Sequence, residues 1–131
     1  MYTISKQFNF SAAHRLRRLP EDHPCSTLHG HNYKVTVELV SNILDVTGMV
    51  FDYRRLEPIK RWIDSTLDHQ NLNDLHFFSM DETLSNPTAE NLARVIYIKC
   101  KELLPDLYRD GIKINAVTVG ETDKTWARYE A

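Results

Sequence analysis

The segment HGHNYKVTVEL, which runs from His29 to Leu39, combines two histidines with the pattern of a β-strand. From Tyr33 onward, every second residue is apolar, which is typical of a strand with one buried face. His29 and His31 continue this parity, so both side chains point to the same side if the strand reaches back that far. The segment therefore predicts a strand over residues 31–40 that begins beside two histidines.

Three other segments show the same alternation. Residues 2–11 form the first predicted strand, and His14 lies just beyond its end. Residues 112–121 and 125–130 form two more strands around a turn. Prolines predict a loop between the first two strands. If these two strands pair, His14 lies alongside the two histidines of the second strand.

Two helices are predicted between the second and third strands. The first follows Asp52, a suitable N-cap residue. Because Pro58 lacks a backbone donor and clashes with the preceding turn, we expect a short turn first and the regular helix from near Pro58. The apolar stripe of this helix, at spacings of three and four, is Leu56, Ile59, Ile63 and Leu67.

The second helix begins where Asn86 or Thr88 can cap it and where Pro87 fits its first turn. The segment DLHFFSMDETLS, residues 74–85, is predicted as part of the loop that joins the helices. The buried stripe of the second helix is Leu92, Ile96, Cys100 and Leu103.

The predicted order is strand, strand, helix, helix, strand, strand (ββααββ) over one domain, residues 1–131. This order favours an α+β fold with a four-stranded antiparallel sheet and both helices on one face. A sheet of this size exposes its edges, and pairing with a neighbouring subunit is one way to protect them.

The composition excludes several classes of protein. The chain is 42% apolar and 26% charged with a net charge of −2, as in ordinary globular proteins. No run approaches the roughly 18 apolar residues of a membrane span, and the N-terminus lacks the features of a signal peptide. Basic residues gather only at Arg15, Arg17 and Arg18, so no nucleic-acid interface is expected. We expect Cys25 and Cys100 to be reduced in a cytoplasmic protein.

Histidine and cysteine residues supply a candidate metal site. Neutral imidazoles from His14, His29 and His31 would leave a tetrahedral zinc ion with one open position, as in catalytic sites. Alternating histidines also occur as ordinary surface or core residues. Cys25 has two roles open to it. As a fourth ligand it would close the site and make it structural, whereas outside the coordination shell it would act as a thiolate base.

Three acidic or basic residues are further candidates. The dipeptide Asp68-His69 is either an ordinary helix end or a proton relay in which the carboxylate fixes the imidazole tautomer. The relay requires a turn, because adjacent side chains diverge. Glu121 shares the parity of Val117 and Val119, so it ends an apolar strand face. Its carboxylate either contacts water at the rim of the sheet or is buried, where it would accept two parallel hydrogen bonds from the planar, amidine-like edge of a ligand.

Six segments occur in this order and span almost the whole chain: FNFSAAHRL, CSTLHGHNYKV, TGMVFDYRRL, LDHQNLND, NPTAENLA and VTVGET. Through them the chain resembles the 6-pyruvoyl-tetrahydropterin synthase superfamily, and most closely its bacterial 6-carboxytetrahydropterin synthase branch, which serves queuosine biosynthesis. The resemblance implies the tunnelling fold, whose subunits close a barrel. It also implies a homohexamer of two trimers with active sites between subunits.

The resemblance further implies roles for individual residues. The implied ligands of Zn²⁺ are His14, His29 and His31. The implied catalytic residues are Cys25, as base rather than ligand, with Asp68 and His69 as a second proton-transfer pair. The implied substrate-binding residues are Glu121, which anchors the amino-pyrimidine edge of a pterin, and Thr88, which lines the pterin pocket.

The implied reaction converts 7,8-dihydroneopterin triphosphate to 6-carboxy-5,6,7,8-tetrahydropterin and releases acetaldehyde and triphosphate. Three alternatives stay open. One is a synthase with the same site that yields the 6-pyruvoyl product, and another is a non-catalytic module with a structural Cys/His₃ zinc. The third is an α+β binding domain that holds no metal. From charge alone, the Arg15, Arg17 and Arg18 cluster is a candidate for receiving the triphosphate.

Overall fold

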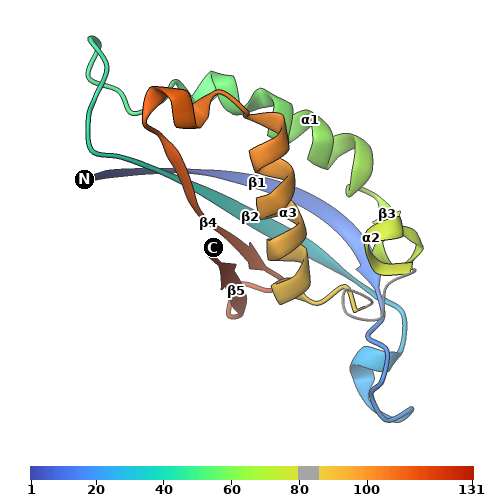
Figure 1. The fold of residues 1–131 in the computed structure, drawn as a ribbon. Helices are drawn as coiled ribbons and strands as arrows, with labels where there is room; N and C mark the ends of the chain where they lie inside the picture. The colour runs from blue at the N-terminus through green and yellow to red at the C-terminus, as the bar shows by residue number, and fades with distance from the viewer. Residues whose placement is uncertain (80–85) are drawn as a thin grey trace.

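The computed structural model describes residues 1–79 and 86–131 and is built on a five-stranded sheet with the order β3-β1-β2-β4-β5 (Figure 1). Four strands are antiparallel neighbours, and the short β3 runs parallel to β1 at one edge. The strands are β1 (Tyr2–His14), β2 (His29–Ser41), β3 (Gln70–Asn71), β4 (Lys113–Gly120) and β5 (Trp126–Tyr129). The predicted α+β class is confirmed.

The predicted four-stranded antiparallel sheet with the order ββααββ is wrong because it omits β3. This strand pairs with Ala12 and Ala13 of β1. Two residues are too few to show an alternating pattern, so nothing in the sequence marks β3 as a strand. The strand matters for the site because it follows His69 directly and pairs with the end of β1 that carries His14.

Both long helices lie on the same face of the sheet (Figure 1). Helix α1 (Glu57–Thr66) follows a 3₁₀ turn, η2 (Tyr53–Leu56), in which the Arg54 N–H donates to the Asp52 carboxylate at 2.9 Å. The short turn expected before Pro58 is therefore confirmed. All four residues of the predicted stripe are buried: Leu56, Ile59, Ile63 and Leu67.

Helix α3 (Ala89–Leu103) is capped by Thr88, whose Oγ1 accepts a hydrogen bond from the Asn91 N–H at 3.1 Å. Pro87 therefore lies before the cap, and the prediction that it belongs to the first helical turn is wrong. Most of the predicted stripe is buried, and only its last residue, Leu103, is half-buried.

Short helical elements complete the described chain. The segment predicted as a loop over residues 74–85 contains a helix, α2 (His76–Ser79), and residues 80–85 lie outside the described part. None of the helices in the described ranges is long and apolar enough to cross a membrane. The remaining 3₁₀ turns are η1 (Pro24–Ser26), η3 (Leu72–Asp74) and η4 (Leu107–Asp110).

One row of the core leads to the candidate site. Phe10 of β1 pairs with Tyr33 of β2, and the two rings stack with centroids 4.8 Å apart. The same face continues to His14 at the end of β1, and to His31 and His29 at the start of β2. The alternation that builds the core therefore also decides on which side the three histidines lie.

Candidate active site

Three histidine rings meet at the end of the β1–β2 pair. His14 lies opposite His29 in the strand register, and His31 lies opposite Ala12. The ring centroids are 4.7 to 5.0 Å apart, and one nitrogen from each ring lies within 4.8 Å of the other two. Tyr33 contacts the His14 and His31 rings edge-on. These three residues form a group of donors that could hold a metal ion.

Hydrogen bonds fix which nitrogens of two rings face the centre of the cluster. His14 Nδ1 lies 2.7 Å from the Pro87 carbonyl O, and His29 Nδ1 lies 2.7 Å from the Thr27 carbonyl O. Because a carbonyl oxygen only accepts, both Nδ1 atoms carry protons, and the neutral rings have their lone pairs on Nε2. The two Nε2 atoms face each other at 3.2 Å. Two lone pairs at this distance repel unless a proton or a metal cation lies near them, so the donor set fits a metal ion.

Burial favours the form of these imidazoles that binds metals. His14 is 1% exposed, and its burial lowers its pKa, although the Pro87 carbonyl and the Glu121 carboxylate act in the opposite direction. Burial also lowers the pKa of His31, again against the charge of Glu121. A neutral imidazole offers a lone pair to a metal ion, whereas an imidazolium does not.

Two asparagine side chains hold the chain where it leaves β1. Asn73 accepts a hydrogen bond from the Arg15 N–H at 2.8 Å and donates to the Arg15 carbonyl O at 3.0 Å. Asn86 makes the same pair of bonds with Arg17, at 2.6 and 2.9 Å. This asparagine clamp fixes the residues that follow His14. Sequence reasoning missed it, because the partners are 58 and 69 residues apart and no local pattern links them.

The guanidinium of Arg17 takes part in the same arrangement. Its Nη1 donates to the Phe78 carbonyl O at 2.6 Å, and its Nη2 donates to the Asn73 carbonyl O at 3.4 Å. These main-chain partners give the side chain a structural role within the subunit. The expectation that Arg15, Arg17 and Arg18 receive a triphosphate stays a prediction.

Asp68 and His69 are hydrogen-bonded to each other. His69 Nδ1 lies 2.8 Å from Asp68 Oδ2, and Asp68 Oδ1 accepts a hydrogen bond from the Ser11 N–H at 2.9 Å. The required turn is made by His69 itself, which has a φ of 60°. The left-handed region costs a non-glycine residue about 1–2 kcal/mol. The Ser11 N–H, and then the His69 side chain, hold the pKa of Asp68 below its usual value, so the carboxylate stays ionised and keeps a proton on His69 Nδ1.

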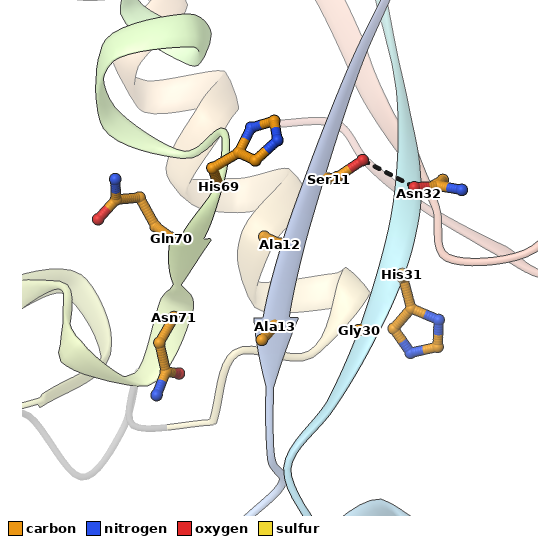
Figure 2. A pocket seen from close by; sticks show the side chains of 9 residues that line it. All are labelled: Ser11, Ala12, Ala13, Gly30, His31, Asn32, His69, Gln70 and Asn71. Carbon is orange, nitrogen blue, oxygen red and sulfur yellow. Dashed lines mark hydrogen bonds between the residues drawn. The ribbon is translucent and has the colours of Figure 1, made fainter.

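His69, in the turn before β3, and His31, in β2, line the same shallow depression of about 490 Å³ (Figure 2). Beside them, Ser11 Oγ donates to Asn32 Oδ1 at 2.7 Å. Figure 2 shows the His69 ring on the β3 side of β1 and the His31 ring beyond β2. Within one subunit, the Asp68–His69 pair and the histidine cluster therefore do not converge.

The other predicted site residues lie in separate elements. Glu121 follows β4 directly, and its Oε1 lies 3.9 Å from His14 Nε2. Cys25 is half-buried in η1, between β1 and β2, and does not belong to the group of three histidines. Thr88 caps α3. Glu121 therefore lies beside the histidine cluster. Cys25 is held in the η1 turn, and Thr88 is held at the N-cap of α3.

Comparison with known proteins gives the family of this chain. A sequence model of 6-pyruvoyl tetrahydropterin synthase matches residues 3–131. The chain belongs to the 6-pyruvoyl tetrahydropterin synthase family. The resemblance carried by the six sequence segments is therefore confirmed.

Relatives within this family carry two names. The chain is 31% identical to the 6-carboxy-5,6,7,8-tetrahydropterin synthase of Bacillus subtilis, over 98% of this chain and 84% of the relative. It is 34% identical to the protein of the same name from Synechocystis sp., over 98% of this chain and 93% of the relative. The solved structure of 6-pyruvoyl tetrahydropterin synthase from Caenorhabditis elegans matches with a TM-score of 0.83 at 30% identity, covering 99% of this chain and 95% of that chain.

In this member of the synthase family, acid should destabilise the metal-free fold through the histidines. The pKa values of His14 and His31 are lowered in the folded state, whereas an unfolded histidine titrates near pH 6.5. Their contribution to stability is complete above that pH and is lost as the pH falls through the lowered values, because the unfolded chain then binds more protons. We expect the Tm of chelator-treated protein to fall between about pH 7 and pH 5.

Calorimetry across this range checks the expectation. The pKa of Asp68 is lowered, so this carboxylate loses its contribution only in more acidic solution, outside the window. Replacing His31 by asparagine should flatten the pH dependence. A Tm of the metal-free protein that is constant or rises between about pH 7 and pH 5 would contradict the expectation.

Proposed function

We propose that this protein is a zinc-dependent 6-carboxytetrahydropterin synthase. It would convert 7,8-dihydroneopterin triphosphate and water to 6-carboxy-5,6,7,8-tetrahydropterin, acetaldehyde and triphosphate, in the biosynthesis of queuosine or another 7-deazapurine. The observation that carries the proposal is the pair of Nε2 atoms of His14 and His29 that face each other at 3.2 Å beside His31. It is supported by the relatives that bear the name of this synthase.

Zinc suits this donor set, because three neutral imidazoles leave a tetrahedral ion one position for substrate. When bound, zinc would supply Lewis-acid stabilisation of the charge that develops on the side-chain oxygens of the substrate. The protein holds the ligands in place. The carbonyls behind His14 and His29 orient the two rings, and the asparagine clamp fixes the chain beyond His14.

Two groups would carry the proton transfers. Cys25 removes a proton from the substrate side chain as a thiolate base, and His69, held by Asp68, returns a proton or takes the next one. Triphosphate leaves by elimination. Addition of water, with cleavage of the bond between the first two side-chain carbons, then leaves the 6-carboxylate and releases acetaldehyde.

The Asp68–His69 pair would serve the site of a neighbouring subunit. The His69 side chain is 82% exposed, and its ring lies apart from His31 within one subunit (Figure 2). The family resemblance implies the assembly in which this occurs, a homohexamer of two trimers with active sites between subunits. In this proposal, each subunit is a single cytoplasmic domain of residues 1–131.

Glu121 would anchor the pterin ring. Its carboxylate can accept two parallel hydrogen bonds from the amino-pyrimidine edge. Because the carboxylate lies 3.9 Å from His14 Nε2, a pterin held there would lie beside the histidine cluster. Thr88 would line the pocket. Its Oγ1 accepts from the Asn91 N–H, which leaves the hydroxyl proton and a second lone pair for a ligand.

The products test the proposal. We expect zinc-loaded protein with 7,8-dihydroneopterin triphosphate to form the 6-carboxy product and acetaldehyde in equal amounts, because both arise from the same cleavage. Mass spectrometry identifies the pterin, and alcohol dehydrogenase with NADH quantifies the acetaldehyde. A 6-pyruvoyl product without acetaldehyde would assign the other activity, whose name the Caenorhabditis elegans structure bears. Absence of any turnover would contradict both the 6-carboxy and the 6-pyruvoyl synthase activity.

A further inference from the structure

The turn that carries Cys25 is closed by a histidine. In η1, the Cys25 N–H donates a hydrogen bond to His23 Nδ1 at 3.0 Å. The Ser26 N–H and the Ser26 Oγ both donate to the His23 carbonyl O, at 3.0 and 2.7 Å. The backbone of His23 is extended, with φ −70° and ψ 131°, as at an N-cap. His23 is therefore the N-cap of the turn.

The sequence makes this cap depend on one hydrogen bond. Because Pro24 has no N–H, the Cys25 N–H is the first donor of the turn, and His23 Nδ1 satisfies it. Nδ1 accepts only when it carries no proton, so the neutral ring has its proton on Nε2. Serine, threonine, aspartate or asparagine usually fill this position. Here an imidazole holds the backbone of the candidate base.

The other backbone group of Cys25 ties the turn to β1. The Leu16 N–H donates to the Cys25 carbonyl O at 2.8 Å. Leu16 lies two residues after His14, between the two residues that the asparagine clamp holds. Cys25 is therefore fixed on both sides, by His23 and by the segment that leaves His14.

We propose that His23 is a positioning residue that directs the Cys25 thiol toward substrate bound at the histidine cluster. The proposal rests on the proposed function, which gives Cys25 its reaction. The connection of residues 15–28 has η1 as its regular element, so the direction of the thiol depends on this turn. A reacting group displaced by about 1 Å can lose on the order of 100-fold in rate. His23 acts through Cys25 and needs no contact with substrate.

Two variants of His23 test this role by steady-state kinetics. Alanine removes the cap, whereas asparagine keeps a side-chain acceptor. We expect His23→Ala to lower kcat about 10- to 100-fold and to change KM about twofold or less. Zinc content should equal that of the wild type, and Tm should fall by only a few degrees, the shift that the loss of one cap produces. His23→Asn should restore kcat to within about threefold of the wild type.

Several results would overturn the positioning role. A kcat of His23→Ala equal to that of the wild type would do so, and so would a loss that asparagine does not rescue. Loss of zinc or of the folded state in His23→Ala also counts against the proposal, because His23 would then have a general structural role.

The rate at which Cys25 is alkylated measures, without substrate, how well the η1 turn shields the thiol. Cys100 does not interfere, because it is buried and its burial raises its pKa to about 12. We expect iodoacetamide to modify Cys25 about fivefold faster in His23→Ala than in the wild type or His23→Asn, since a turn without its cap exposes the thiol. Unchanged alkylation would overturn the proposal.

A double-mutant cycle separates this inference from the proposed function. If His23 acts through Cys25, adding His23→Ala to Cys25→Ala should not lower the residual activity further. Additive losses would overturn the positioning role. A fully active Cys25→Ala protein, together with faster alkylation in His23→Ala, would instead contradict the catalytic role of Cys25. The role of His23 as the cap of the turn would still hold.

Discussion

Replacement of His31 by alanine is expected to abolish metal binding and to lower turnover about a thousandfold or more, because Lewis-acid stabilisation is worth several kcal/mol. Two imidazoles would remain, and two ligands do not hold zinc in a protein site. His31 is the best position for this test. It is half-buried and lies opposite the small Ala12, whereas His14 is fully buried and bonded to Pro87, so its loss would also disturb the fold.

Elemental analysis of the purified protein, circular dichroism and the product assay together measure this effect. His76→Ala is the matched control, because it removes an exposed imidazole from α2 and should leave the metal content unchanged. A folded His31→Ala protein with full metal content and full activity would exclude the histidine cluster as the metal site.

Replacement of Cys25 by alanine is expected to leave the protein folded and loaded with zinc, and to lower kcat about 100- to 10,000-fold, the range that a general base contributes. The reason is structural. Cys25 does not belong to the group of three histidines, so its removal should not open the metal site. Its turn is held through backbone groups that alanine retains.

The same variant tests the alternative of a structural zinc module. In that case Cys25 would be a fourth ligand, and Cys25→Ala would lose zinc together with folded structure. Metal content and circular dichroism distinguish the two outcomes. Cys25→Ser is the conservative control, because its hydroxyl fits the same turn but is a far weaker base than a thiolate. A Cys25→Ala protein with wild-type kcat would remove the thiol from the reaction.

The parts of the site that could be predicted from the sequence are those governed by a fixed period. Alternation from Tyr33 to Leu39 predicts which face of β2 is buried, and that parity also places His29 and His31. The turn before Pro58 was also predictable from local sequence, because proline lacks a backbone donor and clashes with the preceding turn of a helix.

The parts that could not be predicted depend on contacts between residues far apart in the chain. The asparagine clamp joins side-chain amides to backbone groups, and any asparagine could make such bonds. The Pro87 carbonyl orients His14 only because the segment that precedes α3 lies beside the end of β1. β3 exists because the left-handed turn at His69 delivers two residues to the edge of β1, and two residues leave no pattern.

The uninterrupted pairing of β1 with β2 limits how this protein can change during evolution. Every residue from Tyr2 to His14 has a partner in β2, and the pairing has no bulge that could absorb an extra residue. A single insertion or deletion within either strand would turn its histidines to the opposite face of the sheet and separate them from one another. Changes in length should therefore be tolerated in the connections between strands, whereas the strands themselves can diverge only by substitution.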